Sequence, residues 1–112
     1  MSQQADPLVF TLSSQADADG AVVYTDRNNL TIVGYSVGGT VGGAPSAATI
    51  DIQEGGTDVE TALDISTYGY FDLDDPVLID AQTAIDIDVN FTGGTSPTFT
   101  GNITLFTLRG LA

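Results

Sequence analysis

The chain has 112 residues, with 15 acidic side chains, two basic ones and neither cysteine nor histidine, so its formal net charge is -13. This length is typical of one domain, and a hydrophobic content of 42% is too high for an acidic disordered tail. The charge excludes nucleic acid and anionic membrane surfaces as partners, because both require a basic footprint.

The chain begins with residues 1–7, which we interpret as a flexible arm ahead of a single domain over residues 8–112. This start lacks the basic residues and the apolar stretch of a signal peptide. No apolar run is long enough to span a bilayer. We therefore expect a soluble protein that is made in the cytoplasm.

Apolar and polar residues alternate through most of the chain, which predicts β-strands. Clusters of Gly, Asn, Asp and Pro separate these runs at intervals of roughly 8–12 residues, as in sandwiches and barrels. The strong predicted strands are residues 8–12, 21–25, 30–37, 48–53, 84–91 and 102–108, and the weaker ones are 63–65, 68–73 and 76–79. About eight short antiparallel strands predict an all-β jelly roll or another Greek-key β-sandwich.

Two segments between the strong strands have a different character. Residues 38–45, GGTVGGAP, predict a flexible loop because of their glycines. Residues 57–64, TDVETALD, are the best helical candidate, since Thr57 and Glu60 have the spacing of a capping box. The segment is so short that we expect at most one helical turn there.

Residues 84–91, AIDIDVNF, show the alternation most clearly. Side chains two apart on a strand share a face, so the core face holds Ile85, Ile87, Val89 and Phe91, and the other face holds Asp86, Asp88 and Asn90. The two Asp side chains start about 6.6 Å apart, a spacing found in glycosidase pairs. A catalytic acid needs burial or a close like charge, and nothing marks this face as buried. We favour a solvated face, with catalysis and weak cation binding as the alternatives.

Denser groups of acids lie in predicted turns. Asp17 and Asp19 begin a D-x-D-G fragment that lacks the remaining ligands of a calcium loop. In FDLDDP, Asp72, Asp74 and Asp75 offer several oxygens to a hard cation such as calcium. Asp-Pro turns are also common without metal. Apart from calcium at this turn, we expect no cofactor.

Enzyme chemistry has few routes open in this composition. Without His, Cys or Lys there is no Ser-His or Cys-His pair and no Schiff base. The glycine-rich segment GGTVGG lacks the basic residue of a phosphate-binding loop. We expect a protein that is not an enzyme.

Two regions predict contact surfaces. Tyr68 and Tyr70 beside Asp72 suit either a sugar platform or, as we favour, a subunit contact. In the closing strand NITLFTLR, Ile103 and Leu105 face one way while Phe106 and Leu108 face the other, and a strand apolar on both faces is covered on both. We expect a neighbouring subunit as the second cover, with Arg109 pairing with carboxylates there. The predicted interface residues are Phe106, Leu108, Arg109, Tyr68 and Tyr70.

The segments ATIDIQEGGTDV, AIDIDVNFTGG and NITLFTLRG together resemble small β-sandwich virion proteins of tailed bacteriophages, among them capsid decoration (cement) proteins. The similarity lies in the strand-turn rhythm, the GGT turn and the closing apolar strand over residues 8–110, and no individual site residue transfers. It implies a jelly-roll subunit on the capsid surface, a homotrimer that binds the major capsid protein. The alternative is a carbohydrate- or receptor-binding module of a phage tail or fibre, which would use Tyr68, Tyr70 and residues 72–75.

Overall fold

The computed structural model describes residues 6–25 and 29–109, without the side chains of residues 18–24 and 109, and none of the described residues lies in a helix. The described residues form eight β-strands, the approximate number that the sequence predicts. They are β1 (Asp6–Gln15), β2 (Ala18–Thr25), β3 (Leu30–Gly42), β4 (Ala47–Glu54), β5 (Thr57–Asp64), β6 (Gly69–Ile79), β7 (Ala84–Thr92) and β8 (Thr98–Arg109).

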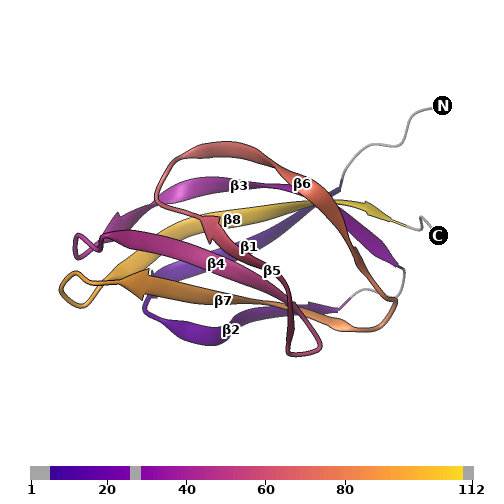
Figure 1. The fold of residues 1–112 in the computed structure, drawn as a ribbon, viewed down its shortest axis with the longest axis horizontal. Helices are drawn as coiled ribbons and strands as arrows, with labels where there is room; N and C mark the ends of the chain where they lie inside the picture. The colour runs from indigo at the N-terminus through magenta and orange to yellow at the C-terminus, as the bar shows by residue number, and fades with distance from the viewer. Residues whose placement is uncertain (1–5, 26–28, 110–112) are drawn as a thin grey trace.

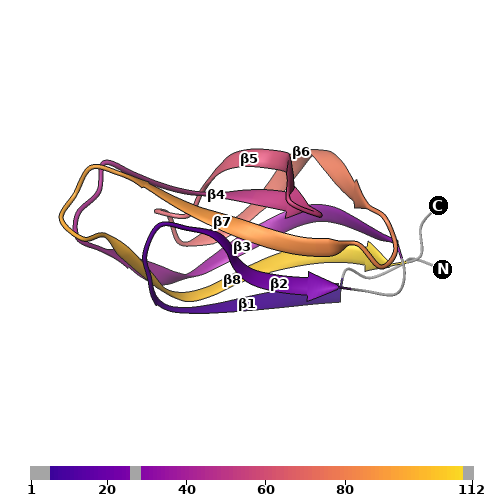
Figure 2. The same ribbon diagram turned by 90° about the horizontal axis from the view of Figure 1, so that it is seen from below.

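The strands form two antiparallel sheets that pack as a sandwich (Figures 1 and 2). Sheet A has the order β1-β8-β3-β6, and sheet B has the order β2-β7-β4-β5. The pairs β1–β8, β2–β7, β3–β6 and β4–β5 are those of one long hairpin folded on itself. The pairs β3–β8 and β4–β7 then roll this hairpin into two sheets. This is the strand order of a jelly roll, so the predicted fold class is confirmed.

The core lies between the sheets and takes alternate residues from both. Ile85, Ile87 and Val89 of β7 are fully buried, as the alternation in residues 84–91 predicts. They face a second set of buried side chains from sheet A, which includes Phe10, Leu12, Leu30, Ile32, Val37, Phe99, Ile103 and Leu105. Burial of such side chains is the main favourable contribution to folding.

The segment TDVETALD forms strand β5, so the prediction of a helical turn there is wrong. Its residues pair with β4, with Gln53 opposite Asp58 and Ile50 opposite Leu63. The capping-box spacing of Thr57 and Glu60 is a weak local preference, and pairing along β4 overrides it.

The prediction of a flexible loop over residues 38–45 is also wrong for its first half. Strand β3 continues to Gly42, and Gly39 pairs with Gly101 of β8. A Cβ atom on Gly101 would meet the backbone of Gly38 and Gly39, and Gly101 has a φ of +140°. Glycine is therefore required here for close contact between two strands rather than for mobility.

Strand β6 contains the segment that the sequence predicts to be a turn. The β3–β6 register passes from Ile32 opposite Val77 to Gly34 opposite Asp72. Residues 73–76 of β6 therefore stand against the single residue Val33, and this stretch arches out of the ladder as a large bulge. Bulges of this kind re-aim side chains at sheet edges.

At the opposite edge of sheet A, Asp6 and Pro7 of the predicted arm open β1 and pair with β8. The hydroxyl of Thr107 donates to the Asp6 carbonyl at 3.1 Å. The rest of the predicted arm lies outside the described residues. Among the residues that are described, no helix is long and apolar enough to cross a membrane.

The β3–β8 contact predicts that Gly101→Ala lowers the free energy of unfolding far more than Gly56→Ala. Gly56 also has a positive φ, of +86°, but a Cβ atom there would meet nothing within 4 Å. Gly56→Ala should therefore cost about 1–2 kcal/mol for the left-handed backbone alone. Gly101→Ala should add about 1–3 kcal/mol for the steric overlap. Urea denaturation measures both, and equal losses would contradict the close approach of the strands.

Candidate functional site

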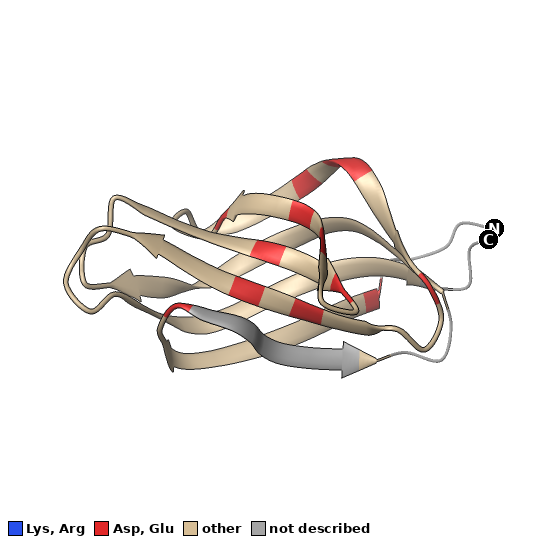
Figure 3. Cartoon of the chain, turned by 60° about the horizontal axis from the view of Figure 1, so that its bottom comes forward, with Lys and Arg blue, Asp and Glu red and all other residues tan. Residues whose placement is uncertain are grey.

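The two outer faces of the sandwich differ sharply in charge. The outer face of sheet B carries acidic residues along β4, β5 and β7 (Figure 3). The outer face of sheet A presents mainly Thr, Ser, Gly and apolar side chains in the rows that its register defines. Each face therefore supplies one candidate site, and a cavity at the open edge supplies a third.

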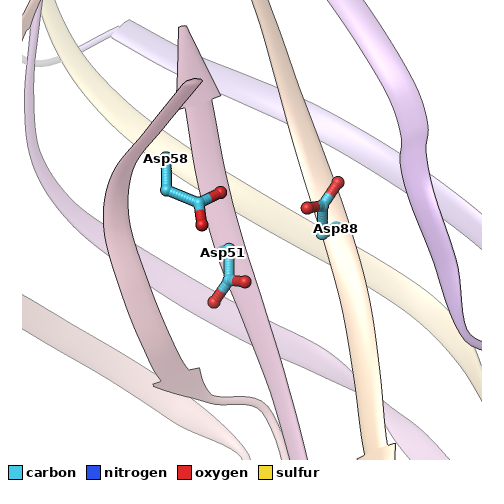
Figure 4. A group of neighbouring side chains, drawn as sticks. All are labelled: Asp51, Asp58 and Asp88. Atoms are coloured by element: carbon cyan, nitrogen blue, oxygen red, sulfur yellow. The ribbon is translucent and has the colours of Figure 1, made fainter. Parts of the chain in front are cut away.

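Three aspartates of sheet B form a cluster, Asp51 on β4, Asp58 on β5 and Asp88 on β7 (Figure 4). One carboxylate oxygen from each lies within 4.8 Å of the others. Asp51 and Asp88 are directly opposite each other in the β4–β7 ladder. Like charges in that position destabilise a sheet. Asp88 is only 5% exposed, so the predicted solvated face is wrong for this residue.

Neighbouring donors hold two members of the cluster in place. The Ala62 N–H donates to Asp51 Oδ1 at 2.9 Å, and Asn90 Nδ2 donates to Asp51 Oδ2 at 3.2 Å. Gln53 Nε2 donates to Asp58 Oδ1 at 2.7 Å. An all-carboxylate set of oxygens is the ligand type that hard cations such as calcium prefer. The three neighbouring carboxylates give this part of sheet B a local negative charge.

Asp86 lies beside this cluster on β7, and its carboxylate is in an unfavourable environment for a negative charge. Its Oδ1 is buried and has no hydrogen-bond partner among the described residues. Burial raises the pKa of Asp86, and the charge of Asp58 raises it further. The sequence marks Asp86 and Asp88 as a pair, but register brings Asp51 and Asp58 to Asp88 instead. The hypothesis that Asp86 and Asp88 form a catalytic pair stays a prediction.

The outer face of sheet A carries a second candidate site, which we call the apolar face and define by Val9, Tyr70, Leu78, Phe106 and Leu108. Val9, Tyr70 and Leu78 are 53%, 51% and 50% exposed. Phe106 and Leu108 are half-buried. The Tyr70 and Phe106 rings meet edge to face at a centroid distance of 5.3 Å. These five residues come from β1, β6 and β8, and β3 contributes Thr31, Gly34 and Ser36 to the rows between them.

The predicted interface residues are distributed unevenly over this surface. Tyr70, Phe106 and Leu108 come together on it, as neighbours across β6, β3 and β8. Tyr68 is 78% exposed but precedes β6, outside the sheet. The side chain of Arg109 lies outside the description. Sequence reasoning missed Val9 and Leu78, although the runs LVF and PVL, which are apolar on both faces, were the available signal.

One acid touches the apolar face at its margin. The Tyr70 hydroxyl donates to Asp72 Oδ1 at 2.7 Å. This bond raises the pKa of Tyr70, because it stabilises the neutral phenol beside a carboxylate. Asp72 is exposed and lies opposite Gly34 in the ladder. Its contact fixes the Tyr70 ring in position over the sheet.

A cavity of about 270 Å³ lies between β5 and β6, where the β6 arch leaves the sheet. The aromatic rings of Tyr35 and Phe71, 5.2 Å apart, form part of its lining. The Tyr35 hydroxyl donates to the Asp64 carbonyl at 2.9 Å, and burial, followed by the charge of Asp64, raises the pKa of Tyr35. The remaining lining residues are Glu60, Leu63, Asp72, Leu73, Asp74 and Asp75.

The predicted calcium ligands Asp72, Asp74 and Asp75 therefore border a cavity. Among the described residues, the group of acids whose oxygens gather within 4.8 Å is Asp51, Asp58 and Asp88. Calcium binding by the three β6 acids stays a prediction. Asp72, Asp74 and Asp75 lie along an extended arch of β6 rather than in a tight turn, so their carboxylates are not gathered around one point.

Comparison with known proteins does not extend this description. No family model, curated protein or solved structure matches the chain. A jelly roll supports many unrelated functions, so function has to be argued from the surfaces themselves.

The aspartate cluster predicts that Asp58→Asn raises the melting temperature. Asparagine keeps an oxygen for the Gln53 bond but removes one of three adjacent charges. The free energy of unfolding should rise by about 0.2–1 kcal/mol at low ionic strength. This gain should shrink in ~1 M NaCl, where the Debye length is ~3 Å.

The matched control is Asp80→Asn, which removes the same charge from an exposed residue outside the cluster. Differential scanning calorimetry of both variants with and without salt gives the comparison. An equal gain from Asp80→Asn would show that net charge alone limits stability. A loss of stability for Asp58→Asn that appears only in millimolar CaCl₂ would instead identify the cluster as a cation site.

Asp86 and Asp64 predict opposite effects of pH on stability. A folded pKa raised by burial means that ionising Asp86 opposes folding, so Asp86→Asn should be more stable than the parent at neutral pH. The gain, below about 1 kcal/mol for a partly exposed group, should fade as pH falls to about 4 and protonates the parent residue.

Asp64 provides the contrast. Bonds from Ser66 Oγ at 2.6 Å and the Ser66 N–H at 2.8 Å lower its pKa. Its charged form therefore stabilises the fold above its unfolded pKa, and that contribution is lost as pH falls through its folded pKa. Asp64→Asn should be less stable than the parent at neutral pH. Thermal melts over the pH range measure both variants, and parallel curves would contradict the assignment.

Proposed function

We propose that the protein is a non-enzymatic structural component of a tailed-phage particle, a capsid decoration (cement) protein that stabilises the head as an oligomer. The observation that carries this proposal is the apolar face. Val9, Tyr70 and Leu78 each leave about half of their surface in water, although the chain has enough acids to cover itself with charge. Apolar patches of this kind mark interaction sites in soluble proteins.

Three further features support a structural role. The composition provides no His, Cys or Lys for nucleophilic catalysis. The jelly roll is a fold used by viral capsid proteins. The strand-turn rhythm of the sequence resembles that of phage virion proteins. The virion surface is accordingly the proposed location, and the major capsid protein is the proposed partner.

A second candidate is a carbohydrate- or receptor-binding module of a phage tail or fibre. The observation that favours it is Tyr68, which is 78% exposed in the segment that joins β5 to β6, the two strands between which the cavity lies. Exposed tyrosines stack on sugars, and carboxylates such as those of Asp74 and Asp75 accept bonds from sugar hydroxyls. The apolar face, which lies outside that cavity, has no part in this function.

Capsid binding is the direct test of the proposal. The purified protein should co-sediment with expanded heads assembled from a major capsid protein encoded beside it, and it should raise the temperature at which those heads rupture. Tyr68→Ala should leave this binding unchanged but abolish any signal on a glycan array. Failure to bind heads, together with Tyr68-dependent glycan binding, would establish the second function instead.

A further inference from the structure

We infer that the apolar face is occupied by the same face of a second copy of this chain, so that two sandwiches stack through sheet A about a two-fold axis. This inference rests on the proposed function, because it names the partner at the surface which that proposal uses. It goes beyond that function by fixing the orientation of the pair and the residues that meet.

The charge distribution is what selects a second copy. Two copies of a chain with a net charge of -13 repel each other wherever their acidic surfaces meet. The defined residues of the apolar face carry no charge. The described acids of sheet A lie on its two edge strands, Asp6 on β1 and Asp72, Asp74 and Asp75 on β6, and Asp72 accepts a bond from Tyr70. The acids Asp51, Asp58 and Asp88 lie on the opposite side of the sandwich. Two copies can therefore approach through the central strands β8 and β3, which contain no acid, with less of this repulsion than through sheet B.

The distance between the two acidic faces makes stacking through sheet A much less repulsive than stacking through sheet B. Packed sheets lie about 10 Å apart, so a stack of four layers would hold the two acidic faces about 30 Å from each other. That is nearly four times the Debye length of about 8 Å at physiological ionic strength. Stacking through sheet B would instead place the acids of both copies in the contact. A basic partner would also be drawn to sheet B, because its strands carry more of the described acids than those of sheet A.

The whole outer face of sheet A, of which the apolar face is a part, has an area that suits a stable pair. Four strands at about 4.8 Å spacing and about 35 Å of strand length give a face of roughly 700 Å². A standard interface uses about 800 Å² from each partner. A single self-complementary face pairs two copies and closes there, whereas the predicted homotrimer would require each copy to use two different surfaces.

Sedimentation equilibrium of the full chain tests the pairing. At tens of micromolar the mass should be twice the 11.6 kDa of one chain. Val9→Glu and Leu78→Glu should each weaken the dimer at least about tenfold, because each places two like charges in an uncharged contact. Both side chains are about half exposed, so the variants should fold. Should either glutamate variant unfold, Val9→Ser and Leu78→Ser test the same positions.

The matched control is Thr92→Glu, which adds the same charge at an exposed position of sheet B and should leave the dimer intact. Lowering the ionic strength from about 0.15 M to about 0.01 M should weaken the dimer, because the Debye length then reaches ~30 Å. A monomeric or trimeric wild-type chain, or equal loss in Thr92→Glu, overturns the inference.

The outcomes separate this inference from the proposed function. A monomeric chain that still binds phage heads would retain the function and remove the pairing. A dimer that Val9→Glu dissociates, but that binds no heads, would retain the pairing and remove the function.

Discussion

The arrangement of this protein depends on one constraint, which is that its 15 carboxylates cannot enter an apolar core. A two-layer sandwich has only two outer faces and its edges in which to place them. The chain concentrates the strand acids on sheet B and on β6 at one edge of sheet A, and leaves the central strands β3 and β8 of sheet A without acids. The crowding of Asp51, Asp58 and Asp88 and the open apolar face are therefore two consequences of one distribution.

The sequence was sufficient to predict which residues of β7 and β8 face the core, because alternation depends only on strand geometry. It could not predict that Asp88 is buried beside Asp51 and Asp58. That contact depends on the register of three strands, with Asp51 opposite Asp88 and Asp58 opposite Gln53. Register follows from turns and bulges across the whole sheet. The sequence therefore indicates the nearby pair Asp86 and Asp88, but not the spatial cluster that Asp88 forms with Asp51 and Asp58.

The two incorrect segment predictions share a cause. Thr57 and Glu60 favour a helix start, and GGTVGG favours a loop, when each segment is considered alone. In the fold, both segments form ladders, β5 in a hairpin with the preceding strand β4, and the end of β3 with β8, which is distant in sequence. Strand pairing decides both cases, because an exposed capping box or a glycine run offers too little local stability to resist it.

The apolar face has a fixed shape as well as a composition. A Cβ atom on Gly34 would meet the Tyr70 hydroxyl and ring, so the glycine on β3 makes room for the tyrosine on β6. The Tyr70 ring also packs edge to face on Phe106, and its hydroxyl is bound by Asp72. A ring held on three sides loses little further freedom when a partner covers it, which lowers the entropic cost of association. A face that served only to meet water would gain nothing from this fixed geometry, and the positions of Gly34 and Asp72 therefore favour a surface preorganised for contact.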